Sequence, residues 1–258
     1  MPMTVEERRA LIEERLRSDG EVDFASLAAM FEVSEMTIRR DIDVLETQGA
    51  VRRVRGGAIA YSHKAEEPAF GTRVESATAE KAHIATAAVE LLEPHETVII
   101  DSGSTALAVA HQIRGRGLGL TVITPSVLAA LELVDEPNTT VFLTGGRMRP
   151  GELSLIGSDA QATYRRYNCD TYIMGVAGVD AKRGLTDYHS EESDVKRAAM
   201  ESADRVILAV DSSKLGRVQL VNIAPLNAVN TIVTDGSHDD PVLEAARQQG
   251  IDVRVAHE

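Results

Sequence analysis

The sequence of 258 residues contains a single cysteine, Cys169. One cysteine excludes a disulfide within the chain and a zinc site built from several cysteines, which fits a reducing compartment. We expect Cys169 to be a core residue rather than a nucleophile. The seven histidines are scattered, without a close pair at the spacing typical of metal ligands. We therefore expect no metal site and no cofactor, with His189 beside Glu191 and Glu192 as the one remaining candidate group of ligands.

Long apolar runs and an excess of positive charge are also missing. No segment approaches 18 continuous apolar residues, and the first 16 residues contain no apolar core of a signal peptide. We expect a cytoplasmic protein without membrane contact. The net charge of −13 ordinarily argues against nucleic acid as a partner, so any such contact must depend on local charge.

The length allows two domains of unequal size. Residues 61–72 break the periodic pattern with Pro68 and Gly71, which is typical of an interdomain linker. We therefore expect a small N-terminal domain at residues 1–60, a linker at 61–72 and a larger domain at 73–258.

Residues 35–47 have the pattern of a short amphipathic helix. Ser34 is a suitable N-cap, and Gly49 is a suitable residue just beyond the C-terminus. Apolar residues recur at three- and four-residue steps, and we expect this stripe to be buried. It consists of Met36, Ile38, Ile42, Leu45 and, less regularly, Val44.

Two further helices are predicted upstream. Asp23 can cap a helix at residues 24–31, with Leu27, Ala28 and Phe31 inward and a tight turn at residues 32–33. An earlier helix at about residues 5–17 would place Leu11, Ile12 and Leu16 inward. Together the three segments predict a helix-turn-helix, whose second helix lies in the major groove of DNA.

An arginine-rich hairpin is predicted after the third helix. The sequence AVRRVRGGAI at residues 50–59 indicates a strand, a glycine turn and a second strand. Residues 1–60 hold nine arginines and twelve acids, yet residues 47–63 hold three arginines and no acid. A lone amphipathic helix with two arginines is usually just solvated, but the caps, the spacing and the hairpin together favour DNA binding. The predicted DNA contacts are Ser34, Glu35, Thr37, Arg39 and Arg40 on the helix and Arg52, Arg53 and Arg55 on the hairpin.

The second domain alternates apolar runs with helical stretches. The runs lie at residues 97–100, 120–124, 140–145, 171–176, 205–210, 231–235 and 253–255, and the helical stretches at 104–114, 125–133, 191–202 and 241–249. This alternation predicts an α/β domain with a mainly parallel sheet that is covered on both faces. Ligands of such sheets bind at the carboxyl ends of the strands.

The first of these strand ends is followed by a loop rich in small and hydroxyl residues. Small residues let the backbone turn closely, and hydroxyls together with free N–H groups at a helix start suit an anion such as phosphate. The alternative is that these residues serve only as a helix cap. The loop comprises Asp101, Ser102, Gly103, Ser104 and Thr105.

Other strand ends carry compatible chemistry. Glu192 and Lys196 lie four residues apart on one helical face, so they could form a surface ion pair or could converge on a polyol with a neighbouring strand end. The additional candidates are Thr124 and Ser126, then Gly145, Gly146 and Arg147, and finally Asp211 and Lys214.

The sequence as a whole resembles a known protein family. The sequence SEMTIRRDIDVLETQGAVRRVRGGA is similar to the winged-helix signature of the DeoR family of bacterial transcriptional regulators. The motifs DSGST, TGG, GLTD, EESDVK and DSSKLG match that family's sugar-phosphate sensor domain in the same order. The resemblance implies a repressor whose C-terminal domain is similar in fold to ribose-5-phosphate isomerase, senses a phosphorylated sugar or related metabolite and forms oligomers.

The resemblance also assigns roles to residues. It implies that Asp101, Gly103, Ser104 and Thr105 belong to the effector loop, Gly145 and Gly146 to a second loop, and Glu192, Lys196, Asp211 and Lys214 to the polar side of the pocket. One departure is Pro125, where the family commonly has asparagine; proline supplies neither an N–H nor an amide side chain, so this loop should contribute less. Tyr188 and His189 precede the acidic helix, and we expect His189 to help select the sugar.

Two interpretations of the function remain open from the sequence. The favoured one is a homo-oligomeric, effector-controlled DNA-binding repressor, with double-stranded operator DNA and a phosphorylated sugar as partners. The alternative is a sugar-phosphate isomerase-like enzyme with a DNA-binding appendage, because carboxylates and lysines could support an enediol mechanism. Repression and activation are not separable by sequence.

Overall fold

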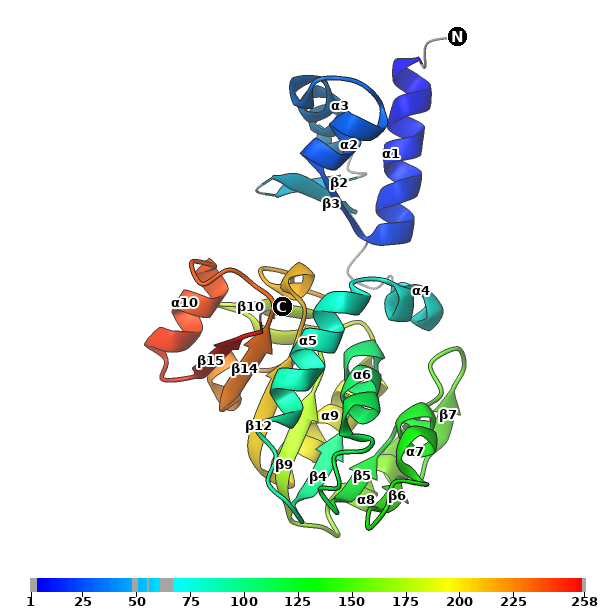
Figure 1. The fold of residues 1–258 in the computed structure, drawn as a ribbon, viewed down its shortest axis with the longest axis vertical. Coiled ribbons are helices and arrows are strands. Elements are labelled where there is room, and N and C mark those ends of the chain that lie inside the picture. Colours follow the sequence, from blue (N-terminus) through cyan, green and yellow to red (C-terminus); the bar gives the residue numbers. More distant parts are fainter. Residues whose placement is uncertain (1–3, 48–50, 55, 61–66, 257–258) are drawn as a thin grey trace. The chain divides into compact units, whose positions relative to one another are not determined.

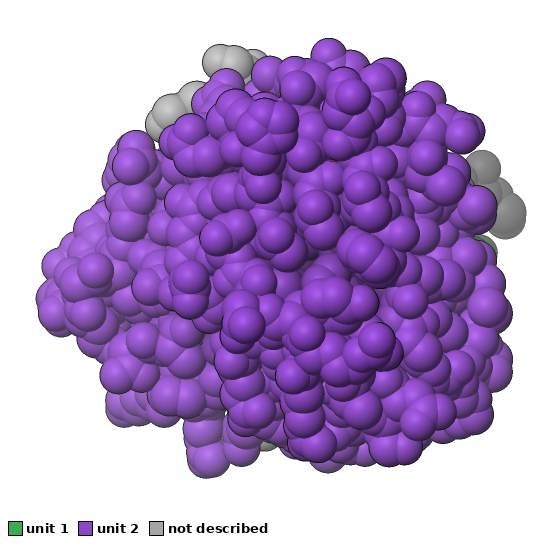
Figure 2. All heavy atoms as spheres, turned by 90° about the horizontal axis from the view of Figure 1, so that it is seen from below, with its two compact units in different colours: residues 1–67 green, residues 68–258 purple. Residues whose placement is uncertain are grey.

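The computed structural model describes residues 4–47, 51–54, 56–60 and 67–256 (Figure 1). The chain divides into two compact units, residues 1–67 and 68–258, and the surface of the second is drawn in purple in Figure 2. Among the described residues, no helix is long and apolar enough to cross a membrane.

The first unit is a three-helix core with a small antiparallel sheet in the strand order β1-β3-β2. Three predicted helices and the predicted hairpin are present, and the short strand β1 is an addition that the sequence pattern did not predict. The elements are α1 (Val5–Asp19), β1 (Glu21–Asp23), α2 (Phe24–Met30), α3 (Glu35–Thr47), β2 (Val51–Val54) and β3 (Gly57–Ala60).

Side-chain caps start the helices of this unit as the sequence predicts. The Asp23 carboxylate accepts a hydrogen bond from the N–H of Ser26 at 2.8 Å, and the Ser34 hydroxyl accepts one from the N–H of Thr37 at 3.2 Å. The predicted cap Gly49 lies outside the described residues. At Gly57, an added Cβ would lie 2.0 Å from the carbonyl oxygen of Val22, so only glycine allows β3 to pass this close to β1.

Two predictions about which residues form the core of the first unit are wrong. Ile12, Ile38 and Ile42 are fully buried, but Leu11 and Met36 are exposed by 41% and 59%. Residues 8, 12 and 16 of α1 recur at four-residue steps and face inward, which leaves position 11 beside the stripe. Met36 precedes Ile38 by two residues and therefore lies on the far side of the helix.

The second unit is a three-layer α/β domain. Its seven-stranded sheet has the order β15-β14-β12-β9-β4-β5-β6, and every neighbouring pair is parallel. The strands are β4 (Thr97–Ile100), β5 (Thr121–Thr124), β6 (Thr140–Leu143), β9 (Cys169–Met174), β12 (Ala203–Ala209), β14 (Thr231–Thr234) and β15 (Asp252–Val255). The predicted parallel sheet is thus confirmed, and the strands predicted at 140–145 and 171–176 each end two residues earlier than expected.

Helices cover both faces of this sheet. One face packs against α5 (Thr78–Val89), α6 (Ser104–Ile113) and α7 (Val127–Leu133), of which α5 and α6 lie side by side in Figure 1. The other face packs against α8 (Ser158–Tyr164), α9 (Ser190–Glu201) and α10 (Pro241–Gln248). Cys169 is buried as predicted, and burial followed by the charges of Asp170 and Asp204 raises its pKa to about 11.

Several elements of the second unit were not predicted. The helix α4 (Phe70–Glu75) begins inside the expected linker, so the last part of residues 61–72 is helical rather than extended. An antiparallel hairpin and a separate antiparallel sheet project beyond the carboxyl ends of the parallel strands. They are formed by β7 (Arg147–Arg149) with β8 (Ser154–Ile156), and by β10 (Gly178–Asp180), β11 (Gly184–Asp187) and β13 (Val221–Ala224), while Ser212–Lys214 and Leu226–Ala228 are single 3₁₀ turns.

Candidate functional site

The exposed face of α3 carries the predicted helical DNA contacts. Arg40 is exposed and makes no hydrogen bond or ion pair with the part of the chain that the structure describes. Arg39 lies 3.5 Å from Glu35, one turn earlier on the same face, and its guanidinium lies 4.6 Å from the centre of the Phe24 ring. These side chains are therefore presented to solvent on one side of a helix whose other side is buried.

Ser34 and Thr37 have local roles as well. Their hydroxyl oxygens are 2.9 Å apart and share a hydrogen bond, in addition to the cap that Ser34 provides. Both hydroxyls therefore help to start α3. Met36, which the sequence pattern assigned to the core, is exposed on the outer side of α3.

On the hairpin, Arg53 is tied to the third helix. Its guanidinium donates to the Asp43 carboxylate at 2.8 Å, and its backbone N–H donates to the Glu46 carboxylate at 2.8 Å. The side chain of Arg52 and all of Arg55 lie outside the described part of the structure. The position of the hairpin relative to α3 is thus fixed through Arg53.

A buried ion-pair cluster that the sequence did not reveal joins α1 to α3. Asp41 is 2% exposed, and its two oxygens accept from Arg8 at 2.7 Å and from Arg9 at 2.8 Å. The only available signal was that Asp41 follows Ile38 by three residues and so approaches the buried face. The cluster orients the helix that carries the predicted DNA contacts.

In the second unit, the predicted loop after β4 lies where the strand order reverses. The chain moves from β4 outward to β5 and β6, and returns to β9 on the other side of β4. Adjacent strands that lead in opposite directions leave a crevice at their carboxyl ends, which is the usual ligand site of such sheets. Asp101 follows β4 at this point, and Gly175 follows β9.

Asp101 is the centre of a buried charged cluster. Its Oδ2 accepts from the N–H of Gly175 at 3.0 Å and from the ammonium of Lys196. Lys196 also donates to the carbonyl of Gly175 at 2.8 Å and lies 3.6 Å from Asp187. Burial lowers the pKa of Lys196, but Asp101 and Asp187 outweigh burial and the net shift is upward, so Lys196 stays charged.

Two buried tyrosines adjoin this cluster. Burial, and then the negative charge of Asp101, raise the pKa of Tyr164 and of Tyr172 well above the ordinary value. Both hydroxyls therefore stay protonated at neutral pH and surround the Asp101 carboxylate with neutral groups.

The N-terminus of α6 lacks a side-chain cap. Gly103 occupies the N-cap position with φ of 114°, a conformation that favours glycine, and provides no capping hydrogen bond. Ser102, Ser104 and Thr105 are partly exposed there, and none of these hydroxyls has a partner among the described residues. The hydroxyls of this loop therefore do not cap α6, and its role as an anion site stays a prediction.

The loop after β5 is used differently. The Thr124 hydroxyl accepts from the N–H of Ser126 at 3.0 Å, and the Ser126 hydroxyl caps α7 by accepting from Ala129 at 3.1 Å. Both residues are buried. Their hydroxyls therefore make hydrogen bonds within the loop and to the start of α7.

The second glycine loop lies at the surface. Gly145 and Gly146 are exposed, and an added Cβ at Gly146 would lie 2.6 Å from the carbonyl oxygen of Ile156. Arg147 begins β7 and lies 2.8 Å from Glu191 at the start of α9. The loop therefore leads directly into the hairpin that contacts α9.

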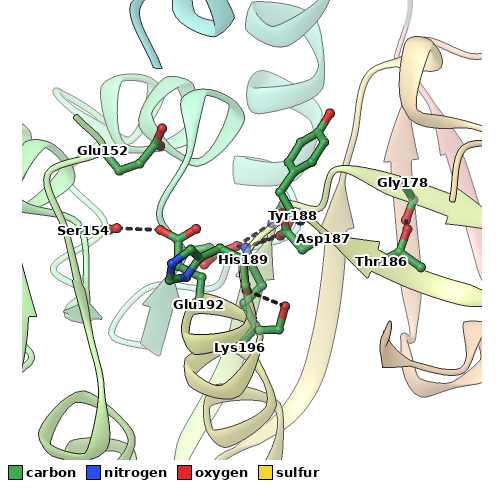
Figure 3. Close-up of polar contacts among 12 residues, drawn as sticks. Glu152, Ser154, Gly178, Thr186, Asp187, Tyr188, His189, Glu192 and Lys196 are labelled. Atoms are coloured by element: carbon green, nitrogen blue, oxygen red, sulfur yellow. Dashed lines mark hydrogen bonds and ion pairs between the residues drawn. The ribbon is translucent and has the colours of Figure 1, made fainter. Parts of the chain in front are cut away.

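Glu192 and Lys196 share a helical face but contact different partners. Glu192 accepts from the Ser154 hydroxyl at 2.6 Å, as the dashed line in Figure 3 shows, and from Arg149 at 2.6 Å. Glu192 and Lys196 are both buried and form no ion pair with each other within the described part of the chain, so they are not a surface ion pair. His189 lies at the N-cap of α9 beside them, and its buried Nδ1 has no hydrogen-bond partner within the described ranges.

Asp211 and Lys214 form a separate group at the end of β12. Lys214 lies 3.8 Å from Asp211 and donates to the Ser213 hydroxyl at 3.1 Å. Burial raises the pKa of Asp211, but Lys214 and the Ser213 hydroxyl outweigh burial, and the net shift is downward. Among the described residues, this pair makes no direct contact with Glu192 or Lys196, and Lys196 contacts Asp101 and Asp187. Their convergence on a bound polyol stays a prediction.

Lys81 of α5 is a residue that sequence reasoning missed. It is 4% exposed and donates to the carbonyl of Ser76 at 2.6 Å. Burial lowers its pKa to about 8, with Asp211 opposing this shift and Lys214 adding to it. A lysine that is easily neutralised thus lies within electrostatic reach of the Asp211 group.

A winged helix-turn-helix followed by an α/β domain with a strand-order reversal beside β4 defines a DNA-binding transcriptional regulator with a sensor domain. Two family models match the chain, the DeoR-like helix-turn-helix domain at residues 8–64 and the DeoR C-terminal sensor domain at residues 76–236. The chain belongs to the DeoR family of transcriptional regulators.

Similar proteins extend over nearly the whole chain. The regulator GlpR of Haloferax volcanii is 34% identical, with 97% of each chain covered. The glycerol-3-phosphate regulon repressor of Escherichia coli K12 is 30% identical, with 94% of this chain and 95% of the relative covered. The repressor GlcR of Bacillus subtilis is 29% identical, with 99% and 98% covered.

Ribose 5-phosphate isomerase A from Methanocaldococcus jannaschii matches 52% of this chain and 53% of its own, with 18% identity and a TM-score of 0.39.

Proposed function

We propose that this protein represses genes of carbohydrate metabolism and that a phosphorylated sugar or related metabolite releases it from operator DNA. The observation that carries the proposal is the uncapped N-terminus of α6, with three partly exposed hydroxyls, at the crevice between β4 and β9. Helix N-termini of this kind bind phosphate through free N–H groups and the helix dipole. The name of one relative, the glycerol-3-phosphate regulon repressor of Escherichia coli K12, supports a phosphorylated metabolite.

The proposed effector contacts surround that crevice. The phosphate would lie on Ser102, Gly103, Ser104 and Thr105, within the field of Lys214 and Lys81. The hydroxyl end would lie towards His189, whose unpartnered Nδ1 suits a sugar hydroxyl. The other proposed pocket residues are Asp101, Thr124, Ser126, Gly145, Gly146, Arg147, Glu192, Lys196 and Asp211.

The proposed activity is binding without turnover. An enediol mechanism requires a free carboxylate as base. Both oxygens of Glu192 already accept hydrogen bonds, one from the Ser154 hydroxyl and one from Arg149, so the carboxylate is occupied by contacts within the protein. The enzyme alternative is therefore not favoured by the site.

Release from DNA would follow from a shift between two states. An effector can only shift that equilibrium by its difference in affinity for the two states, so the proposal requires the DNA-bound state to bind the sugar phosphate more weakly. We further propose that the protein acts as a homo-oligomer in the cytoplasm, because helix-turn-helix proteins usually bind two half-sites as dimers.

The effector proposal predicts a ligand-dependent change in thermal stability. A cognate sugar phosphate at 100 times its Kd should stabilise the sensor domain by about 2.7 kcal/mol. The same concentration should give no shift in Lys214→Ala, and an undiminished shift in the matched control Lys182→Ala, which removes an exposed lysine. Differential scanning fluorimetry against a panel of sugar phosphates measures this, and equal shifts in the two variants would count against the assigned site.

The effector affinity should also depend on pH. Lys81 has a pKa of about 8, so it is charged below that pH and neutral above it. A phosphate dianion gains from the charged form, so binding should weaken as the pH rises through about 8, with proton uptake at that pH. Calorimetry in buffers of different ionisation enthalpy measures this uptake, and in Lys81→Met the uptake should disappear.

For DNA, the exposed Arg40 gives the simplest test. Arg40→Ala should weaken binding about ten-fold near physiological salt and reduce the slope of log affinity against log salt by about 0.9, as expected for the loss of one phosphate contact. Arg183→Ala removes an exposed arginine from the second unit and should change neither quantity. Fluorescence anisotropy across a salt series measures both, and an unchanged slope in Arg40→Ala would remove this residue from the interface.

A further inference from the structure

Acidic side chains accompany the basic ones on the exposed face of α3. Glu35, Arg39 and Asp43 follow one another at four-residue steps and therefore share a face. Glu35 lies 3.5 Å from Arg39, and Asp43 lies 2.8 Å from Arg53 on the hairpin. Two of the arginines predicted to bind DNA are thus ion-paired within the free protein.

A single ring underlies both arginines. The guanidinium of Arg39 lies 4.6 Å and that of Arg53 lies 5.8 Å from the centre of the Phe24 ring, which is 1% exposed. A cation above an aromatic face is held there by the ring quadrupole. Phe24 therefore holds the arginine of the helix and the arginine of the hairpin close together, each beside its own acid.

The charge of the whole domain gives these acids unusual weight. Residues 1–60 carry nine arginines, no lysine and twelve acids, so a domain that contacts a polyanion is itself negatively charged. Affinity for DNA of arbitrary sequence comes almost entirely from phosphate neutralisation. An arginine that is already paired contributes little to it until the pair opens.

We propose that Asp43 competes with DNA phosphates for Arg53 and thereby keeps the affinity for DNA of arbitrary sequence low. This inference rests on the proposed function, because it assumes that the exposed face of α3 and the hairpin meet DNA. When DNA approaches, Arg53 must leave Asp43 for a phosphate, and the Asp43 carboxylate then faces the same phosphates and repels them. Asp43 thus determines how strongly the domain discriminates against DNA without a specific site. Glu35 has the same relation to Arg39 over a longer distance, so its effect is smaller.

The test uses the full chain and a duplex of random sequence, and compares wild type with Asp43→Asn. The variant should bind about three- to ten-fold more tightly at low salt, and its slope of log affinity against log salt should be steeper by about 0.9. Asp19→Asn is the matched control, since it removes the same charge from the pair of Asp19 with Arg15, 3.0 Å apart on α1. Asp43 and Asp19 are about half exposed, so both variants keep the fold, which circular dichroism verifies.

The outcomes separate the inference from the function on which it rests. Tighter binding and a steeper slope in Asp43→Asn alone support the inference. Unchanged or weaker binding in Asp43→Asn overturns it, because Asp43 would then merely position Arg53. An equal gain in Asp19→Asn also overturns it, because net charge would account for the effect. A wild-type protein that binds no duplex at low salt overturns the proposed function and the inference with it.

Discussion

Replacing Lys196 by methionine is expected to lower the free energy of unfolding of the sensor domain by about 3–5 kcal/mol. Lys196 is 5% exposed and is the cation between Asp101 and Asp187, so its loss leaves buried carboxylates without their charged partner. Methionine fills a similar volume, which limits any contribution from a cavity. Urea unfolding followed by circular dichroism measures the change.

Two further variants identify the cause of that loss. Lys182→Met removes an exposed lysine and should change the free energy of unfolding by less than about 0.5 kcal/mol. The double variant Asp101→Asn/Lys196→Met should recover part of the loss, because one uncompensated charge is removed. If the double variant is less stable than Lys196→Met by the full cost of Asp101→Asn alone, the two residues are not coupled and the account of this cluster is wrong.

The second large effect is expected at Asp41. Asp41→Ala removes the common acceptor of Arg8 and Arg9 and leaves the buried Arg8 without its partner. The cost should be about 3–5 kcal/mol, enough to open the small N-terminal unit and to abolish DNA binding while the sensor domain stays folded. Hydrogen exchange of the full chain should show lost protection throughout the first unit, α1 and α3 included, and unchanged protection in the second unit.

A surface pair provides the comparison for this variant. Asp19→Ala breaks the exposed pair with Arg15 on α1 and should cost at most about 1 kcal/mol. Unchanged protection of α3 in Asp41→Ala would mean that apolar packing alone orients this helix.

In the first unit, the periodic pattern predicted burial correctly for residues near the centre of an apolar stripe. Ile38 and Ile42 are buried as expected, whereas Leu11 and Met36 lie beside their stripes and are exposed. Periodicity alone does not locate the edge of a stripe, because burial there depends on which neighbouring element covers it. Charged residues are treated as outward by the same pattern, so the buried Arg8 and Asp41 were not predicted.

In the second unit, continuous apolar strands predicted the parallel sheet because both of its faces are covered. The short strands β7, β8, β10, β11 and β13 were missed, because charged residues, glycine, serine or asparagine interrupt their apolar sequence. The loop of Asp101 was predicted because it follows a buried strand directly. The hydrogen-bond partners of Glu192 were not predicted, because Arg149 and Ser154 lie about 40 residues away in the sequence, on a hairpin that no sequence pattern indicates.

The central claim is that a phosphorylated sugar bound at the α6 N-terminus controls DNA binding by the winged helix. It is tested most directly by titrating the full-length protein onto a duplex that it selects from a random-sequence pool, with and without each member of a sugar-phosphate panel. We expect at least one sugar phosphate to weaken binding by about ten-fold or more in wild type, the size of a typical coupling between sites, and to have no effect in Lys214→Ala. DNA affinity that is the same with every sugar phosphate, or a response that persists undiminished in Lys214→Ala, would contradict the account.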